Sequence, residues 1–156
     1  MNLGLRPAVP EDYAFCKTLY FTENRWILEA LHLDLAAHEI KFPEQWKLSE
    51  VRIIEVDGVD IGWLQSAAHQ DALFLDQLYI VRPFQRRRIG TEIMHRLIAE
   101  AAQANLPLQL DVVKINPALH LYQRLGFHIT GEEEHKFNMT LDPPPRSSAA
   151  PLTAER

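Results

Sequence analysis

The chain has 156 residues, a length typical of one domain with a sizeable core. Its net charge of -5 argues against a general nucleic-acid-binding surface, so any basic site must be local. The single cysteine, Cys16, cannot form an internal disulfide, and its apolar neighbours predict a packed thiol rather than a nucleophile. No apolar run approaches the ~20 residues that cross a bilayer. The first residues lack the layout of a secretory signal, so we expect a cytoplasmic protein without membrane contact.

The first third of the chain predicts a short strand followed by two helices. Leu3 and Leu5 alternate with polar neighbours, which indicates a strand. From residue 13 to about 40, apolar residues recur at helical spacing, and residues 21–24 offer capping side chains. We therefore predict two helices separated at 21–24, followed by a loop at 42–46 with two exposed aromatic residues.

The middle of the chain has the period of β-structure. Residues 51–56 and 59–65 flank the turn Asp57-Gly58, and this pattern predicts a hairpin. A third apolar run, residues 72–81, follows a second turn and is interrupted by Asp76 and Gln77. Three consecutive strands predict an antiparallel meander.

The last part of the chain alternates strands with helices. Residues 89–101 carry apolar positions at helical spacing over about four turns, and residues 108–113 form the next strand. A strand–helix–strand crossover implies parallel pairing of its two strands. Pro117 opens a further helix, and two final strands are predicted at 127–130 and 136–141.

Residues 78–97, LYIVRPFQRRRIGTEIMHRL, predict a buried strand, an arginine-rich turn and a helix. The start of a helix presents unpaired N–H groups at the positive end of its dipole. Arg82, Arg86, Arg87 and Arg88 crowd this turn, and the combination suits a phosphate-bearing ligand. The alternative is a solvated basic surface, or one that contacts RNA, which clustering at a helix start in an acidic protein makes less favoured.

The turn segment and the downstream run NPALHLYQRLGF, residues 116–127, together resemble the Gcn5-related N-acetyltransferase (GNAT) family. The resemblance covers about residues 3–141. It implies one acyl-CoA N-acyltransferase-like domain over residues 1–141, and residues 142–156 read as a Pro/Ser/Ala-rich tail. The predicted fold is α/β (α+β): a mixed, mostly antiparallel sheet of about six or seven strands, with a parallel central pair and flanking helices.

The resemblance implies a site for acetyl-coenzyme A. In the family, the strand before the turn splays from its neighbour and its backbone holds the pantetheine arm. The turn pattern matches at Gln85 and Gly90, but Arg88 stands where glycine is usual, and we expect Arg88 to keep an ordinary backbone conformation with its side chain turned away from the ligand. The implied donor-binding residues are Leu78, Tyr79, Ile80, Gln85, Arg86, Arg87, Arg88, Ile89, Gly90, Thr91 and Asn116.

Two residues are candidates for proton transfer. Tyr122 matches the family tyrosine that protonates the departing thiolate, although alone it would be read as a core aromatic. Asp76 is the best-placed carboxylate to accept the amine's proton, because a carboxylate on a central strand is costly to bury. Side-chain alternation leaves the face of Asp76 undecided, and His69 is an alternative base. Asn116 could equally cap the helix that follows it.

The first two helices would bind the acceptor, through Tyr20, Glu23, Trp26 and Glu29, and carboxylates beside aromatic rings suit a cationic amine. The histidines show no ligand spacing, so we predict no metal site. The favoured function is acetyl transfer from acetyl-CoA to a primary amine, on a small molecule or a peptide, directly in a ternary complex. The main alternative is a non-catalytic domain that binds or senses CoA or acyl-CoA. The identity of the amine stays open, as does the oligomeric state, although dimers are common in the family.

Overall fold

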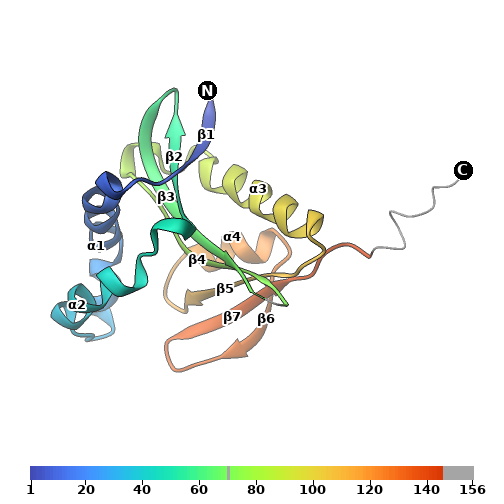
Figure 1. Ribbon diagram of the computed structural model, residues 1–156. Coiled ribbons are helices and arrows are strands. Elements are labelled where there is room, and N and C mark those ends of the chain that lie inside the picture. Colours follow the sequence, from blue (N-terminus) through green and yellow to red (C-terminus); the bar gives the residue numbers. More distant parts are fainter. Residues whose placement is uncertain (70, 146–156) are drawn as a thin grey trace, which may run out of the picture.

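A seven-stranded mixed sheet forms the centre of the computed structural model, which describes residues 1–69 and 71–145 (Figure 1). The strand order is β1-β2-β3-β4-β5-β7-β6. β4 and β5 run parallel, while the other neighbouring strands are antiparallel. This arrangement confirms the predicted fold class. The strands are β1 (Leu3–Pro7), β2 (Val51–Val56), β3 (Val59–Ala68), β4 (Leu73–Ile80), β5 (Leu108–Val113), β6 (His128–Glu132) and β7 (Lys136–Leu141).

Helices cover both faces of the sheet (Figure 1). One face carries α1 (Tyr13–Ala30) and α2 (Leu35–Gln45), and the other carries α3 (Ile89–Gln103) and α4 (Ala118–Arg124). Short 3-10 turns precede α1, β2 and α3: η1 (Pro10–Asp12), η2 (Leu48–Glu50) and η3 (Arg82–Phe84). Within the described residues, no helix is long and apolar enough to cross a membrane.

The two faces bury separate apolar clusters. Ile93, Met94 and Leu97 of α3 are fully buried against the sheet. On the other face, Trp63 of β3 packs with Phe42 and Cys16. The full burial of Cys16 agrees with the predicted packed thiol. The sheet is thus buried on both sides over its central strands, as expected where helices flank both faces.

The predicted break at residues 21–24 is wrong, because α1 runs without interruption from Tyr13 to Ala30. No Gly or Pro lies in 21–24, and Phe21 is buried at 8% exposure in the second cluster, so packing holds this turn helical. Asn24 donates from its side-chain amide to the carbonyl oxygen of Tyr20 at 2.8 Å, within the helix. Its polar side chain therefore supports the helix instead of capping a new one.

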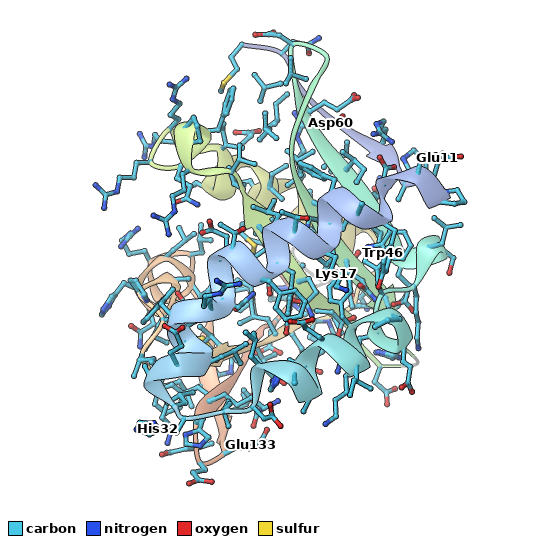
Figure 2. All side chains as sticks on the ribbon, turned by 90° about the vertical axis from the view of Figure 1, so that its left-hand side faces the viewer. Glu11, Lys17, His32, Trp46, Asp60 and Glu133 are labelled. Atoms are coloured by element: carbon cyan, nitrogen blue, oxygen red, sulfur yellow. The ribbon has the colours of Figure 1, made fainter. Side chains whose placement is uncertain are left out.

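The break lies ten residues later, at the turn where His32 adopts a φ of 56° (Figure 2). Asp34 then caps α2, since its carboxylate accepts from the N–H of Ala36 at 3.0 Å. The predicted loop at 42–46 is also wrong: α2 continues to Gln45, and Phe42 is 2% exposed rather than a surface aromatic. Figure 2 shows α1 and α2 lying across the sheet.

The parallel pair β4–β5 parts after a short ladder. Pairing joins Leu73–Leu75 of β4 to Leu108–Leu110 of β5, whereas β4 continues to Ile80. The register between β3 and β4 shifts at the same level, because Gln65 pairs with Gln77 but Ser66 pairs with Leu75. Asp76 is therefore the extra residue of a β-bulge. The edge of β4 beyond Asp76 faces a gap in the sheet.

Gly62 of β3 lets β4 approach closely at this gap. A Cβ at Gly62 would lie 2.3 Å from the carbonyl oxygen of Tyr79 and 3.2 Å from the Cα of Ile80. Such distances leave no room for any side chain, so glycine is required by the backbone of β4. The position of the open strand edge thus depends on a residue in its neighbour.

Candidate active site

A cavity of about 740 Å³ opens where β4 leaves β5; we call it the main cavity. Its walls come from α1, the end of β4, the arginine-rich turn and the start of α4. Most of the predicted site segments therefore meet in one place, although they lie far apart in the chain. The lining residues are Glu23, Trp26, Ile27, Leu78, Tyr79, Ile80, Arg82, Gln85, Arg86, Asn116, Pro117, Ala118 and Tyr122.

Leu78, Tyr79 and Ile80 form the β4 wall of the main cavity, as predicted for the strand before the turn. On one side they pair with β3, and no strand among the described residues pairs with their other edge, because β5 has separated. Backbone N–H and C=O groups on an open strand edge are available to pair with an extended ligand. The splay expected from the resemblance is therefore present.

The arginine turn adopts an unusual backbone. Arg86 and Arg88 have φ values of 62° and 65°, both in the left-handed region. The expectation of an ordinary conformation for Arg88 is thus wrong: it is the left-handed N-cap of α3, with ψ 13°. This explains why glycine suits that position, since only glycine adopts it without strain. The side chain of Arg88 is exposed and does not line the main cavity.

The turn points backbone N–H groups outward at the start of a 15-residue helix, a geometry that attracts anions. Ile89 anchors the turn at 1% exposure. A Cβ at Gly90 would meet only the Cδ1 of Ile80, at 3.8 Å, so the space beside Gly90 is open. Thr91 follows in the first turn of α3 and is partly exposed. These features fit a diphosphate-bearing ligand.

The other arginines divide between two environments. Arg82 and Arg86 line the main cavity, whereas the guanidinium of Arg87 lies over the ring of Phe84, 5.2 Å from its centroid. Gln85 closes the turn, because its side-chain amide donates to the carbonyl oxygen of Ile80 at 2.7 Å. Of the three predicted donor-site arginines, Arg86 therefore lines the cavity, whereas Arg87 and Arg88 do not; Arg82 is an additional lining residue.

Tyr122 of α4 lines the main cavity across from β4, and its ring packs on Phe127 with centroids 5.9 Å apart. Burial raises the pKa of its phenol to about 12. Asn116 also lines the cavity, while its side-chain oxygen accepts from the N–H of Ala118 at 3.0 Å. The capping role considered for Asn116 is therefore present, and it leaves the amide nitrogen without a partner in the described residues.

Asp76 lies elsewhere. It lines a second cavity of about 470 Å³, together with Asp111 and Lys136 from the β5–β7 side, and does not line the main cavity. The bulge explains why alternation could not place it: Leu73 and Leu75 face α3 before the bulge, and Leu78 faces α3 after it. Partial desolvation, and then the charge of Glu50, raise the pKa of Asp76. His69 is exposed in the preceding turn.

Of the four predicted acceptor-binding residues on α1, two line the main cavity and two do not. Glu23 and Trp26 line the main cavity. Tyr20 instead packs edge-on against Tyr79, with centroids 5.6 Å apart, and Glu29 is exposed outside the cavity. No group of three His, Cys, Asp or Glu side chains within residues 1–69 and 71–145 is arranged to hold a metal.

Sequence reasoning missed two contributors to the site. Gly62 shapes the β4 wall from behind, and an isolated glycine inside a strand pattern is the signal that could have indicated it. The second is the contact between helix and turn, where Gln85 donates to a carboxylate oxygen of Glu23 at 2.9 Å. These residues are 62 positions apart, so no local pattern reports their contact.

Comparison with known proteins agrees with this geometry. The model of the acetyltransferase (GNAT) family matches residues 14–127. A Mycobacterium tuberculosis protein named "Probable N-acetyltransferase" is 27% identical over 144 residues, covering 83% of this chain and 82% of that protein. The PaiA N-acetyltransferase of Thermoplasma acidophilum, solved in complex with coenzyme A, superposes with a TM-score of 0.74 at 16% identity, covering 91% of this chain and 99% of that one. Ard1 of Thermoplasma volcanium gives a TM-score of 0.68 at 15% identity, covering 93% and 100%.

Proposed function

Because the chain belongs to the acetyltransferase (GNAT) family, we propose that it transfers the acetyl group of acetyl-CoA to a primary amine, directly in a ternary complex. One observation carries the proposal. The main cavity brings the open edge of β4, the anion-attracting turn and the phenol of Tyr122 together. Direct transfer needs no enzyme nucleophile, which agrees with the full burial of Cys16, whose thiol pKa is raised by that burial to about 11.

The residues present fit acetyl-CoA. The extended pantetheine arm would pair with the backbone of Leu78–Ile80, and the diphosphate would lie at the turn before α3, near Arg82 and Arg86. Asn116 offers its free amide nitrogen to the arm from the opposite wall. Acetyl-CoA supplies the acetyl group as a reactive thioester when bound.

Tyr122 is the proposed acid. A phenol with a pKa raised to about 12 remains protonated throughout the neutral range and can give its proton to the sulfur of the departing thiol. An ordinary tyrosine has a pKa of about 10, whereas Tyr122 in the folded protein stays mainly protonated up to about pH 12. Loss of activity at high pH through ionisation of Tyr122 is therefore expected only well above pH 10.

The prediction that Asp76 accepts the amine's proton stays a prediction, and its place in the second cavity makes it testable. If Asp76 acts, the acceptor must approach through the gap between β4 and β5 from the side of Asp111 and Lys136. Asp76→Asn then lowers kcat without changing the affinity for CoA. An unchanged kcat in Asp76→Asn would instead indicate that the amine enters through the main cavity.

The deciding experiment is release of free thiol from acetyl-CoA in the presence of a panel of primary amines. Tyr122→Phe is expected to lower kcat about 100-fold or more while CoA binding, measured by calorimetry, is unchanged. Tyr13→Phe removes a phenol outside the main cavity and serves as the matched control. Intact CoA binding with no thiol release on any amine would instead favour a domain that binds CoA without catalysis.

A further inference from the structure

Glu23 of α1 has a carboxylate oxygen without a hydrogen-bond partner. Oε1 accepts from Gln85, but Oε2 is shielded from solvent and receives no hydrogen bond from the described residues. Among the described residues, the cation paired with Oε2 is Arg82, whose Nε lies 3.7 Å from that oxygen. That distance is too long for a hydrogen bond. A shielded carboxylate oxygen left unpaired is costly to fold, which points to a ligand that completes it.

Glu23 is also the only carboxylate among the described lining residues of the main cavity. Arg82 and Arg86 from the turn carry guanidinium groups, which have hydrogen-bond donors but no acceptor for a proton. Burial raises the pKa of the two tyrosines in the lining, Tyr79 of β4 and Tyr122 of α4, so their phenols are protonated near neutral pH. Within residues 1–69 and 71–145, the lining contains no histidine and no second carboxylate.

We propose that Glu23 binds the acceptor's ammonium group and takes its proton, with the indole of Trp26 beside it; this inference rests on the proposed acetyl transfer. Trp26 lies one helical turn after Glu23, lines the same cavity and is 44% exposed. An exposed indole next to a carboxylate attracts a cationic amine through its ring face. The acceptor class is therefore a primary amine that arrives as an ammonium ion.

Arg82 couples the two substrates. In the free protein it is the partner of Glu23, yet its side chain is 72% exposed and belongs to the turn that would hold the diphosphate. A doubly charged diphosphate is a stronger partner than a carboxylate at 3.7 Å, so donor binding draws Arg82 away. Oε2 of Glu23 is then free for the ammonium group. The amine binds more tightly to the CoA-bound protein than to the free protein.

The proton transfers balance. The ammonium nitrogen gives one proton to Glu23, and its freed electron pair forms the bond to the thioester carbonyl carbon. The carbon–sulfur bond breaks with its electrons on sulfur, which takes the proton of Tyr122. The nitrogen, which carries one proton too many for an amide, returns that proton to Tyr122, and Glu23 releases its own to water. The sum is one amide, one CoA thiol and one proton.

Glu23→Gln tests the assignment, because glutamine keeps the shape and can still accept from Gln85 through its side-chain oxygen. Glu11→Gln is the matched control, since it removes the same charge from an exposed position just before the same helix, outside the main cavity. Asp76→Asn tests the rival base. The probes are acetyl-CoA for turnover, CoA alone for the donor site, and putrescine, lysine, phenethylamine and a short peptide with a free N-terminus as amines.

We expect Glu23→Gln to keep its affinity for CoA within about threefold and to lower kcat/KM for the amine at pH 7 about 100-fold or more. Calorimetry should also show that wild-type protein loaded with CoA binds the amine, and that loaded Glu23→Gln does not. Activity of this variant should recover as pH approaches the amine's own pKa, about 10 for an alkyl amine and about 8 for a peptide N-terminus, because neutral amine needs no base.

Two results overturn the inference. Unchanged kcat/KM and unchanged amine binding in Glu23→Gln, with turnover intact in the wild type, refute it and leave the proposed function standing. A loss in Asp76→Asn without a loss in Glu23→Gln assigns the proton to the second cavity instead. No turnover by the wild type on any amine refutes the proposed function, and the inference with it.

Discussion

Replacing Arg88 by glycine should stabilise the protein and test why this turn tolerates arginine. Arg88 has φ 65° and ψ 13°, a conformation that costs a residue with a Cβ about 1–2 kcal/mol. Glycine removes that cost, but loses about 0.5–1 kcal/mol through its greater freedom in the unfolded chain. The net expectation is about 0.5–1 kcal/mol of added stability. For a chain of this size that is a rise in Tm of roughly 1–4 °C.

Arg88→Ala is the control that separates backbone from charge. Alanine keeps a Cβ, and therefore the left-handed cost, while removing the same guanidinium. Arg88 forms no ion pair with the described residues, so the alanine variant should stay within about 0.5 kcal/mol of wild type. Urea unfolding of the three proteins gives both differences directly. A glycine variant no more stable than the alanine variant would refute the argument that Arg88 is strained.

The remaining predictions concern packing and accessibility. Gly62→Ala should destabilise the protein by about 1–3 kcal/mol or more and weaken CoA binding, because its Cβ would lie 2.3 Å from the Tyr79 carbonyl oxygen. Urea unfolding measures the loss of stability, and calorimetry measures the affinity for CoA. An unchanged CoA affinity would show that the backbone of β4 does not depend on Gly62. Asn116→Ala should cost about 1 kcal/mol of stability through loss of the cap on the N–H of Ala118, measured by thermal unfolding, and no cost would contradict the capping role. Cys16, at 0% exposure and with a thiol pKa raised by burial to about 11, should react with thiol reagents only as fast as the protein unfolds; rapid labelling in the native state would contradict its burial.

The regular parts of the fold follow from the sequence because their pattern is local. Apolar runs and helical spacing predict β2, β3, β5, β7 and α3. Burial alternates along β5, whereas the middle of β3 is buried continuously because helices cover both faces of the sheet. The break in α1 was predicted wrongly for a physical reason. The capping residues at 21–24 suggest a new helix, but Phe21 is buried in the second cluster and holds the turn helical. Tertiary packing outweighs a capping preference of about 1 kcal/mol.

The site itself consists of departures from those regular patterns. The bulge at Asp76 ends the ladder with β5, Gly62 admits the backbone of β4, and Arg88 holds the left-handed turn before α3. The bulge and the close approach at Gly62 depend on contacts between neighbouring strands, which no single segment encodes. Sequence reasoning therefore found the residue types but neither the face of Asp76 nor the backbone of Arg88. Regular strand and helix satisfy their own backbone groups, whereas a ligand needs groups left unpaired. A site at the point where β4 leaves β5 is therefore what this fold allows.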